Sequence, residues 1–243
     1  MGKENNIKEK FKLALISTAN AISDDFSFEN HKVNNKKIDL FELEKLETRH
    51  DFIKYRAKSD SSALKKKFSN TEVYKKNLPK NSSYKSLYEL SEKIRCELLG
   101  SKILKGVGAN LKENYINKIS LKKNDQLISK EDVNVNEAFE LYMLENFFNI
   151  KLNHQNEKIL NFWKNDFDKS LKDHLEFLSK NLENQEIYNS KVSEILQELN
   201  IFDDTNESTN ENNQQDEIDQ SDENQNNQSP DSNENDAKKQ QED

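Results

Sequence analysis

The sequence of 243 residues predicts a mainly α-helical fold: a helical bundle of six to eight helices with a possible small β-hairpin near the N-terminus and a disordered acidic C-terminal tail. Two observations support this prediction. Apolar residues recur at intervals of three and four over most of residues 5–199, which is the period of one helix face. After Phe202 this period stops, and the residues that follow are mostly Asn, Gln, Asp, Glu and Ser. Such a composition cannot bury enough apolar surface to offset the entropy lost on ordering.

The N-terminal part combines one helix with the only strand-like pattern in the chain. Residues 5–23 have apolar side chains at helical spacing and predict an amphipathic helix. Apolar and polar residues then alternate over residues 26–28 and again over 38–40, with a polar loop between them. This alternation is typical of short strands, so a hairpin is expected here.

The next helical pattern covers residues 42–68. Its apolar register slips near Asp60–Ser62, so either the helix breaks or kinks there or Asp60 faces a polar partner. A short helix over residues 71–77 is expected to end before Pro79, because a proline disfavours the helical conformation of the residue that precedes it.

The stretch Ser86–Leu111 carries the strongest local signal. It belongs to a helix expected over residues 83–99, and Gly100 stands where a C-terminal glycine would end that helix. Gly106 and Gly108 follow closely, so three of the four glycines of the chain fall in this one stretch. This clustering predicts a tight helix–turn–helix, whose second helix reaches about residue 120.

A charged pattern, E-x-x-R-x-E-x-L-G, lies within the first of these two helices. Glu92 and Arg95 are three residues apart, so their side chains share one helix face and can form an ion pair. One interpretation is a solvated pair, whose contribution to stability is well under about 1 kcal/mol. The other is an arginine held for a partner or for an internal network. Glu97 belongs to the same pattern.

The second half of the chain predicts a polar loop over residues 121–133 and three further helices, over residues 134–150, 154–182 and 186–199. The middle one is expected to be a single long helix with a bundle-like apolar seam. Its aromatic residues and those of the preceding helix could line a flat ligand or macrocycle, or could simply form the core. These residues are Phe139, Tyr142, Phe147, Phe148, Phe162, Trp163 and Phe167.

Charge is distributed unevenly along the chain. Residues 203–243 hold fourteen Asp and Glu against two Lys, a net charge of −12, which leaves +4 for residues 1–202. We therefore expect two regions, a helical domain over residues 1–202 and an acidic linker or tail over residues 203–243. The tail could contact basic partners or act as a solubilising spacer. The basic residues are scattered and form no nucleic-acid-binding motif, so no nucleic-acid partner is expected.

Several classes of site have no matching motif. Four glycines cannot form a phosphate-binding loop, so the chain is not expected to bind ATP by itself. No D-x-S-x-S run occurs, and the nearest, Asp25–Glu29, fails at its last position. Glu47 and His50 form one E-x-x-H, whereas a carboxylate di-metal bundle needs two. Cys96 is the only cysteine, so no disulfide framework exists and a reducing compartment is expected. No apolar run is long enough to span a bilayer. We therefore expect a cytoplasmic protein with no membrane partner.

The stretch Ser86–Leu111 closely resembles the N-terminal region of the CobT-type subunit of ATP-dependent cobaltochelatase. The family's E-x-x-R-x-E-x-L-G core is followed by a small connection and G-V-x-x-N-L. The matching positions in this chain are Glu92, Arg95, Glu97, Leu99, Gly100, Gly106, Val107, Asn110 and Leu111. Upstream, the family's R-x-x-x-D-x-x-A-L is matched by Arg56, Asp60, Ala63 and Leu64, and a later proline by Pro79. The resemblance runs from about Phe11 to Phe202. Where the family often has His-Asp, this chain has Ser69 and Asn70, so no role is carried over to that pair.

This resemblance implies a subunit that assembles with an AAA+ ATPase of the CobS type, as part of a hetero-oligomeric ring. The pair would drive cobalt insertion into a corrin ring held by the large CobN-type subunit, in cobalamin biosynthesis. ATP, Mg²⁺ and cobalt would be used by the complex, with no cofactor, metal or catalytic residue in this chain. Glu92, Arg95, Glu97, Gly100, Gly106 and Asn110 would then be partner-contact or structural residues.

Two alternatives to the chelatase role remain open at this stage. The first is an adaptor of an AAA+ remodelling complex of the MoxR or CobS-like kind, unrelated to corrins. The second is a truncated, inactive fragment. Family members continue past the acidic linker into a von Willebrand factor A domain with a metal-ion-dependent adhesion site, and this chain stops inside the linker. The chain is accordingly expected to be a fragment, a split gene product or a shortened relative.

Overall fold

Every regular element in the described part of the chain is a helix, which confirms the mainly α-helical prediction. The computed structural model describes residues 2–24, 46–120, 129–199 and 201–202, with side chains from residue 6 onward. The hairpin expected over residues 26–40 and the acidic tail expected from residue 203 both lie outside these ranges. The helices are α1 (Gly2–Ser23), α2 (Arg49–Phe68), α3 (Thr71–Lys76), η2 (Ser82–Tyr84), α4 (Lys85–Ile103), α5 (Lys105–Ser120), α6 (Val135–Phe148), α7 (His154–Asn161), α8 (Lys164–Leu171), η3 (Lys172–His174), α9 (Leu175–Lys180) and α10 (Gln185–Glu198).

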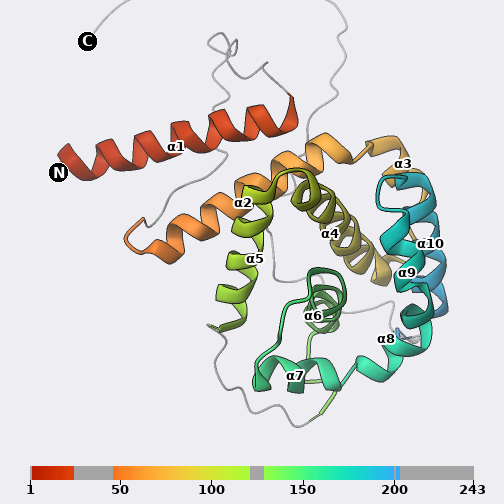
Figure 1. The fold of residues 1–243 in the computed structure, drawn as a ribbon. Helices are drawn as coiled ribbons and strands as arrows, with labels where there is room; N and C mark the ends of the chain where they lie inside the picture. Colours follow the sequence, from red (N-terminus) through yellow and green to blue (C-terminus); the bar gives the residue numbers. More distant parts are fainter. Residues whose placement is uncertain (1, 25–45, 121–128, 200, 203–243) are drawn as a thin grey trace, which may run out of the picture. The chain divides into compact units, whose positions relative to one another are not determined.

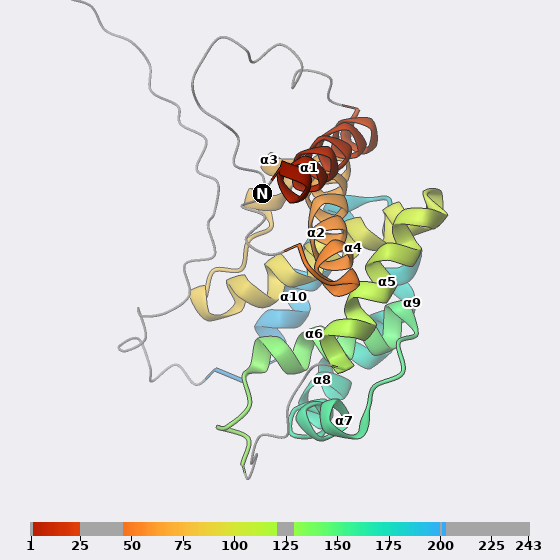
Figure 2. The ribbon, with the colours of Figure 1, turned by 90° about the vertical axis from the view of Figure 1, so that its left-hand side faces the viewer.

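Helix α4 lies at the centre of this arrangement. Helices α2, α5, α6 and α10 each pack against it, and they surround it in Figure 1. Helix α1 packs on α2 and lies on the side of α2 that faces away from α10, as Figure 2 shows. The helix that carries the charged pattern is therefore the one with the most helical neighbours, and its side chains meet partners on several sides.

The apolar core consists of two clusters on either side of α4. The larger joins α4 to the helices of the second half of the chain, with Phe139, Tyr142, Phe167 and Tyr188 among its largest fully buried members. The smaller lies where α1, α2, α4 and α5 meet. It consists of Ile22, Ala57, Ala63, Leu64, Cys96, Val107 and Leu111.

Asparagine side chains begin many of these helices. Asn70, Asn134, Asn153 and Asn184 each accept a hydrogen bond from a backbone N–H in the first turn of the helix that follows. An N-cap of this kind satisfies one of the amide groups that lack a partner inside the helix. The helix starts are thus encoded locally, although Asn at these positions reads in the sequence as ordinary loop composition.

The glycines of the central stretch do not end a helix, contrary to the prediction. Helix α4 continues through Gly100 to Ile103, and the single residue Leu104 separates it from α5. No described glycine has a positive φ. Gly100 is required by packing instead, because a Cβ atom there would lie 2.3 Å from Leu64 Cδ2. A Cβ at Gly108 would approach the Cβ of Ser101 to 2.9 Å, whereas one at Gly106 would meet nothing within 4 Å.

The prediction of a single long helix over residues 154–182 is also wrong. The segment forms α7, α8, η3 and α9, with turns at Phe162–Trp163 and Lys172–His174. A straight helix of this length would span about 44 Å, whereas α6, against which α7 and α8 pack, spans only about 21 Å. The turns keep the segment against α6 and α10, so tertiary packing overrides the local helical pattern.

Helix α2 starts later than predicted and does not break. Residues 46–48 precede it, and Thr48 forms a capping box with Asp51. The helix then runs without a break through residues 60–62, and Asp60 has a polar partner in Asn110, as expected. The remaining helix predictions agree with the structure within about three residues, which is the usual uncertainty of helix ends.

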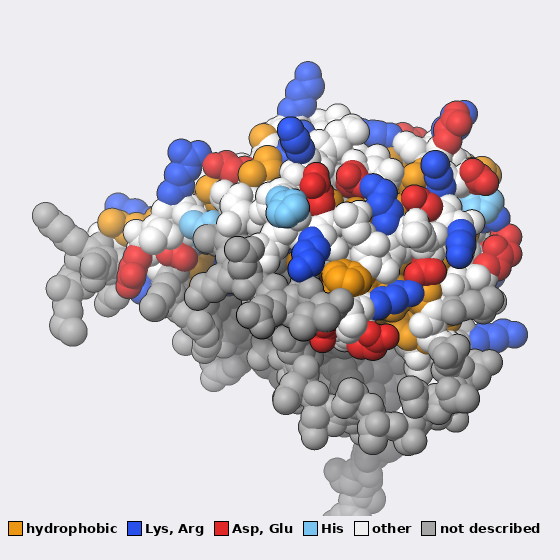
Figure 3. Space-filling model, turned by 90° about the horizontal axis from the view of Figure 1, so that it is seen from below, with side chains coloured by type: hydrophobic (Ala, Val, Ile, Leu, Met, Phe, Trp, Pro, Cys, Tyr) orange, Lys and Arg blue, Asp and Glu red, His pale blue; other side chains and the backbone are white. Residues whose placement is uncertain are grey.

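The surface carries charges of both signs. Figure 3 shows Lys and Arg side chains interspersed with Asp and Glu over the described part of one face, rather than gathered into a field of a single sign. None of the described helices is both long and apolar enough to cross a membrane.

Candidate functional site

The side chain of Arg95 lies in the interior, where it is only 1% exposed. Its Nε and Nη2 atoms donate to the two carboxylate oxygens of Glu92 at 2.7 and 2.8 Å, a bidentate pair. Its Nη1 donates to the carbonyl oxygen of Leu182 at 2.8 Å, and Nη2 donates to that of Phe68 at 2.7 Å. These bonds join α4 to the end of α2 and to the link between α9 and α10. The interpretation of Glu92 and Arg95 as a solvated ion pair is therefore wrong, and the interpretation as an internal network is correct.

Glu92 extends this network toward α10. Gln185 Nε2 donates to the Glu92 carboxylate at 3.0 Å and to the carbonyl oxygen of Asn70 at 3.1 Å. The side-chain oxygen of Gln185 accepts from the backbone N–H of Asn70 at 2.7 Å, and Ser69 Oγ lies 3.3 Å from its nitrogen. The two positions where the chain departs from the resemblance thus contact Gln185. We call this group the first brace. It consists of Glu92, Arg95, Gln185 and the carbonyl oxygens of Phe68 and Leu182.

Burial of the first brace shifts the pKa values of the groups around it. Burial alone would lower the pKa of Arg95, but the hydrogen bonds and charge of Glu92 outweigh it, and the pKa is raised. Burial, followed by the Glu92 charge, raises the pKa of the Cys96 thiol to about 12. Burial also raises the pKa of Tyr188, whose hydroxyl lies 3.0 Å from Ser91 Oγ. Arg95 therefore stays charged and the thiol of Cys96 stays protonated.

Glu97 forms a second brace, which is separate from the first. Its carboxylate, 1% exposed, accepts from Ser61 Oγ and from Tyr115 Oη, both at 2.6 Å. Lys93 Nζ lies 4.0 Å away. These contacts tie α4 to α2 and α5. Burial, and then the Glu97 charge, raise the pKa of Tyr115 well above its usual value, so the phenol remains a hydrogen-bond donor.

Asp60 and Asn110 form a third brace between α2 and α5. Asp60 is fully buried and accepts from Arg56 Nε at 3.0 Å and from Asn110 Nδ2 at 3.2 Å through one carboxylate oxygen. Its other oxygen is buried without a hydrogen-bond partner. Arg56 also donates to Thr18 Oγ1, at 3.4 Å, which connects the third brace to α1.

The six residues predicted as a site therefore do not form one cluster. Glu92 pairs with Arg95, Asn110 pairs with Asp60, and Glu97 binds partners of its own. Gly100 admits Leu64, while Gly106 lies exposed in the first turn of α5. The burial of the three charged residues favours a structural role over direct contact with a partner.

Sequence reasoning missed most of the partners in these braces. Gln185, Ser61 and Tyr115 stand 93, 36 and 18 residues from the carboxylates that they contact. Gln185 reads as an exposed residue in the first turn of a helix, and Tyr115 as one member of an apolar stripe. The loss of register at residues 60–62 was the one signal available, because a polar side chain on an apolar face needs a partner.

The aromatic residues of the second half pack against one another. The rings of Phe139 and Tyr142 lie 5.5 and 5.4 Å from that of Phe167, and Trp163 stacks on Phe167 at 6.4 Å. Within the described residues, no group of three or more His, Cys, Asp or Glu side chains is placed to hold a metal ion. The E-x-x-H histidine, His50, lies half-buried at the start of α2.

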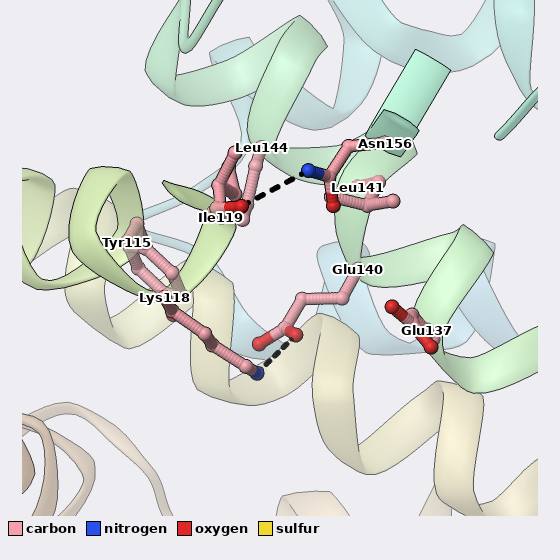
Figure 4. A pocket seen from close by; sticks show the side chains of 8 residues that line it. All are labelled: Tyr115, Lys118, Ile119, Glu137, Glu140, Leu141, Leu144 and Asn156. Carbon is pink, nitrogen blue, oxygen red and sulfur yellow. Dashed lines mark hydrogen bonds and ion pairs between the residues drawn. The ribbon is translucent and has the colours of Figure 1, made fainter. Parts of the chain in front are cut away.

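A cavity of about 230 Å³ adjoins the second brace between α5, α6 and the start of α7. Figure 4 shows its side chains, with Tyr115, Lys118 and Ile119 from α5 on one side and Glu140 and Asn156 across from them. Lys118 Nζ pairs with a Glu140 oxygen at 2.5 Å, and Asn156 Nδ2 donates to the Ile119 carbonyl oxygen at 3.2 Å. None of the aromatic residues proposed as a ligand stripe lines this cavity.

Fold and site together define a helical protein in which the charged residues of the motif cross-link helices. A family model described as "Cobalamin biosynthesis protein CobT" matches residues 5–243. The chain belongs to this family, which gives it a role in cobalamin biosynthesis and agrees with the resemblance drawn from Glu92–Leu111. No solved structure matches the chain.

Proposed function

We propose that the chain acts as the CobT-type subunit of ATP-dependent cobaltochelatase. In this role it assembles with an AAA+ ATPase of the CobS type in the cytoplasm. The assembly drives cobalt insertion into a corrin ring that the CobN-type subunit holds. ATP and Mg²⁺ are used by the ATPase and cobalt is the substrate metal, so the chain contributes assembly rather than a catalytic residue.

The observation that carries this proposal is the internal use of the motif. Glu92, Arg95, Glu97 and Asp60 are each at most 1% exposed, and their hydrogen bonds go to other groups of the same chain. A catalytic group must reach a substrate, whereas these groups are enclosed by helices. A rigid helical body fits a subunit that couples other subunits, and the family match connects that body with cobalamin biosynthesis.

Reconstitution tests the proposal. The full chain is mixed with a CobS-type ATPase, with and without ATP, and fractionated by size. Fractions are then combined with a CobN-type subunit loaded with its corrin substrate, and cobalt incorporation is followed by the change in corrin absorbance. We expect the chain to migrate with the ATPase, and cobalt insertion to require both proteins together with ATP.

The two rival interpretations give different outcomes. An adaptor unrelated to corrins would migrate with the ATPase and stimulate ATP hydrolysis without supporting cobalt insertion. An inactive fragment would fail to migrate with the ATPase in any nucleotide state. Either outcome contradicts the proposed function.

A further inference from the structure

The cavity beside Tyr115 has an apolar floor and an acidic wall. Ile119, Leu141 and Leu144 provide aliphatic surface, and the ring of Tyr115 closes one side. Glu140 lies in the wall and is only 9% exposed. A carboxylate at that depth is stable only when cations or hydrogen-bond donors face it, so the cavity is built around a charge that needs a positive partner.

Lys118 supplies that partner from the surface. Its ammonium lies 2.5 Å from Glu140 Oε2, yet its side chain is 62% exposed. Lys93 lies farther away, with Nζ 3.9 Å from Glu140 Oε1 and 4.0 Å from Glu97. Moving the exposed Lys118 ammonium from Glu140 into water costs little free energy, because hydration of the ammonium replaces much of the ion pair. Lys118 can therefore be replaced by another cation without unfolding its surroundings.

The other polar groups at the cavity also select for a donor. Both N–H bonds of the Asn156 amide are already used, by the Ile119 carbonyl oxygen at 3.2 Å and by Asn153 Oδ1 at 2.6 Å. The amide can therefore offer a ligand only its acceptor oxygen. Glu137 adds a second carboxylate to the lining. The cavity thus combines acceptors with aliphatic surface, which suits a cation on an apolar stem.

We propose that this cavity receives the side chain of one arginine from a partner protein. The guanidinium takes the place of Lys118 on Glu140, and the methylenes of the arginine pack on Ile119 and Leu144. The two oxygens of a carboxylate match the planar fork of a guanidinium better than they match an ammonium. A cavity of about 230 Å³ holds one such side chain, and a corrin ring exceeds it.

The size of the cavity also favours a protein over a free small molecule. A ligand of about seven heavy atoms, at roughly 0.3–0.6 kcal/mol per atom, gains about 2–4 kcal/mol on binding, which corresponds to a Kd in the millimolar range. Such affinity is useful when the side chain is one anchor of a larger interface, and arginine is enriched among such anchors. The proposal is independent of whether the complex inserts cobalt.

Methyl-labelled full-length chain tests the proposal by NMR. Titration with n-butylguanidinium is expected to shift the methyl signals of Ile119, Leu141 and Leu144, with a Kd of about 1–10 mM. Butyrate and n-butanol, which are similar in size but anionic and neutral, are expected to leave these signals in place. The tripeptide acetyl-Leu-Arg-Leu-amide is expected to bind more tightly than n-butylguanidinium, and spermidine is not.

Two substitutions distinguish specific binding in the cavity from nonspecific binding to the protein surface. Lys118→Ala removes the internal competitor and is expected to tighten n-butylguanidinium binding about three- to tenfold. Glu140→Gln removes the charge and is expected to weaken binding at least about tenfold. Lys164→Ala is the matched control, since its ion pair with Glu145, at 3.1 Å, involves no residue that lines the cavity, and it should change nothing.

Three results would overturn the proposal. The first is binding of butyrate or n-butanol as tight as that of n-butylguanidinium, or no shift with any probe. The second is unchanged or weaker binding in Lys118→Ala, in which Lys93 still faces Glu140 at 3.9 Å and whose fold is checked by circular dichroism. The third is tighter binding of spermidine than of the tripeptide, which would assign the cavity to a free amine.

Discussion

Arg95 Nη2 donates a 2.7 Å hydrogen bond to the carbonyl oxygen of Phe68, the last residue of α2. Its Nη1 makes the equivalent bond, at 2.8 Å, to the carbonyl oxygen of Leu182, just after α9. The C-terminal end of a helix carries partial negative charge and carbonyl groups without partners inside the helix. One guanidinium thus serves two chain segments and the Glu92 carboxylate, which explains how a charged side chain can be buried this deeply.

Removing Arg95 should cost much more than removing an exposed arginine. Arg95→Met leaves the Glu92 carboxylate buried without its cation, and we expect a loss of about 3–5 kcal/mol in the free energy of unfolding. Urea denaturation followed by circular dichroism measures this loss. Arg49→Ala is the control, because the Arg49 side chain is 84% exposed and its pair with Glu113 is worth about 1 kcal/mol or less. Equal losses in the two variants would show that the first brace is not buried as described.

Gly100 and Gly106 should respond oppositely to alanine. Gly100→Ala places a Cβ 2.3 Å from Leu64 Cδ2, and overpacking of this kind costs about 1–3 kcal/mol. Gly106→Ala adds a methyl group in open space within a helix and should be neutral or stabilise by up to about 1 kcal/mol. Thermal melting compares the two variants. A larger loss at Gly106 than at Gly100 would be incompatible with this packing.

Alkaline pH should destabilise the fold through its buried tyrosines. Burial, followed by nearby carboxylates, raises the pKa of Tyr74 to about 12, and burial also raises those of Tyr88, Tyr115, Tyr142 and Tyr188. A raised pKa in the folded state means that the unfolded chain loses its protons first. The contribution of these groups to stability is therefore complete below pH 10.0, the ordinary pKa of a tyrosine, and is lost as the pH rises through 12 and beyond.

Melting temperatures measured across this range check the alkaline prediction. They should stay level up to about pH 10 and then fall, with tyrosinate absorbance appearing together with unfolding rather than before it. Tyr115→Phe removes one titrating group and should make the fall shallower. Tyrosinate formation in all tyrosines near pH 10 in the folded protein would contradict the burial of these phenols.

Cys96 should be unreactive in the folded protein. Its side chain is fully buried, and burial with the Glu92 charge raises the pKa of its thiol to about 12, so little nucleophilic thiolate forms at neutral pH. Iodoacetamide labelling followed by mass spectrometry tests this. The native chain should remain unlabelled over times that fully label it in urea. Fast native labelling would mean that the core around Cys96 opens readily.

The sequence predicts the helices well because their evidence is local. Apolar spacing acts over a few residues, and α1, α6 and α10 all lie where their patterns indicate. The single long helix over residues 154–182 failed because its breaks come from packing against α6 and α10, and no proline or glycine marks them. Gly100 was misinterpreted for the same reason, since its role depends on Leu64, a residue 36 positions away.

The candidate site was predictable only in part. The i, i+3 spacing indicated the pair of Glu92 and Arg95, but spacing does not reveal whether the face that carries a pair is exposed. Burial here follows from α2 and α10 covering α4, and the partners that make it tolerable are two backbone carbonyl oxygens and Gln185. Carbonyl oxygens have no sequence signature, so an internal network of this kind becomes visible only in the fold.

Arg95 acts inside the chain rather than at a partner surface. Binding of Arg95→Met to a CobS-type ATPase tests it most directly, at a temperature where circular dichroism shows the variant folded. We predict a melting temperature about 6–20 °C lower than that of the unmodified chain, with a Kd for the ATPase within about twofold of the original value. An unchanged melting temperature together with lost binding would contradict the account and place Arg95 at the interface.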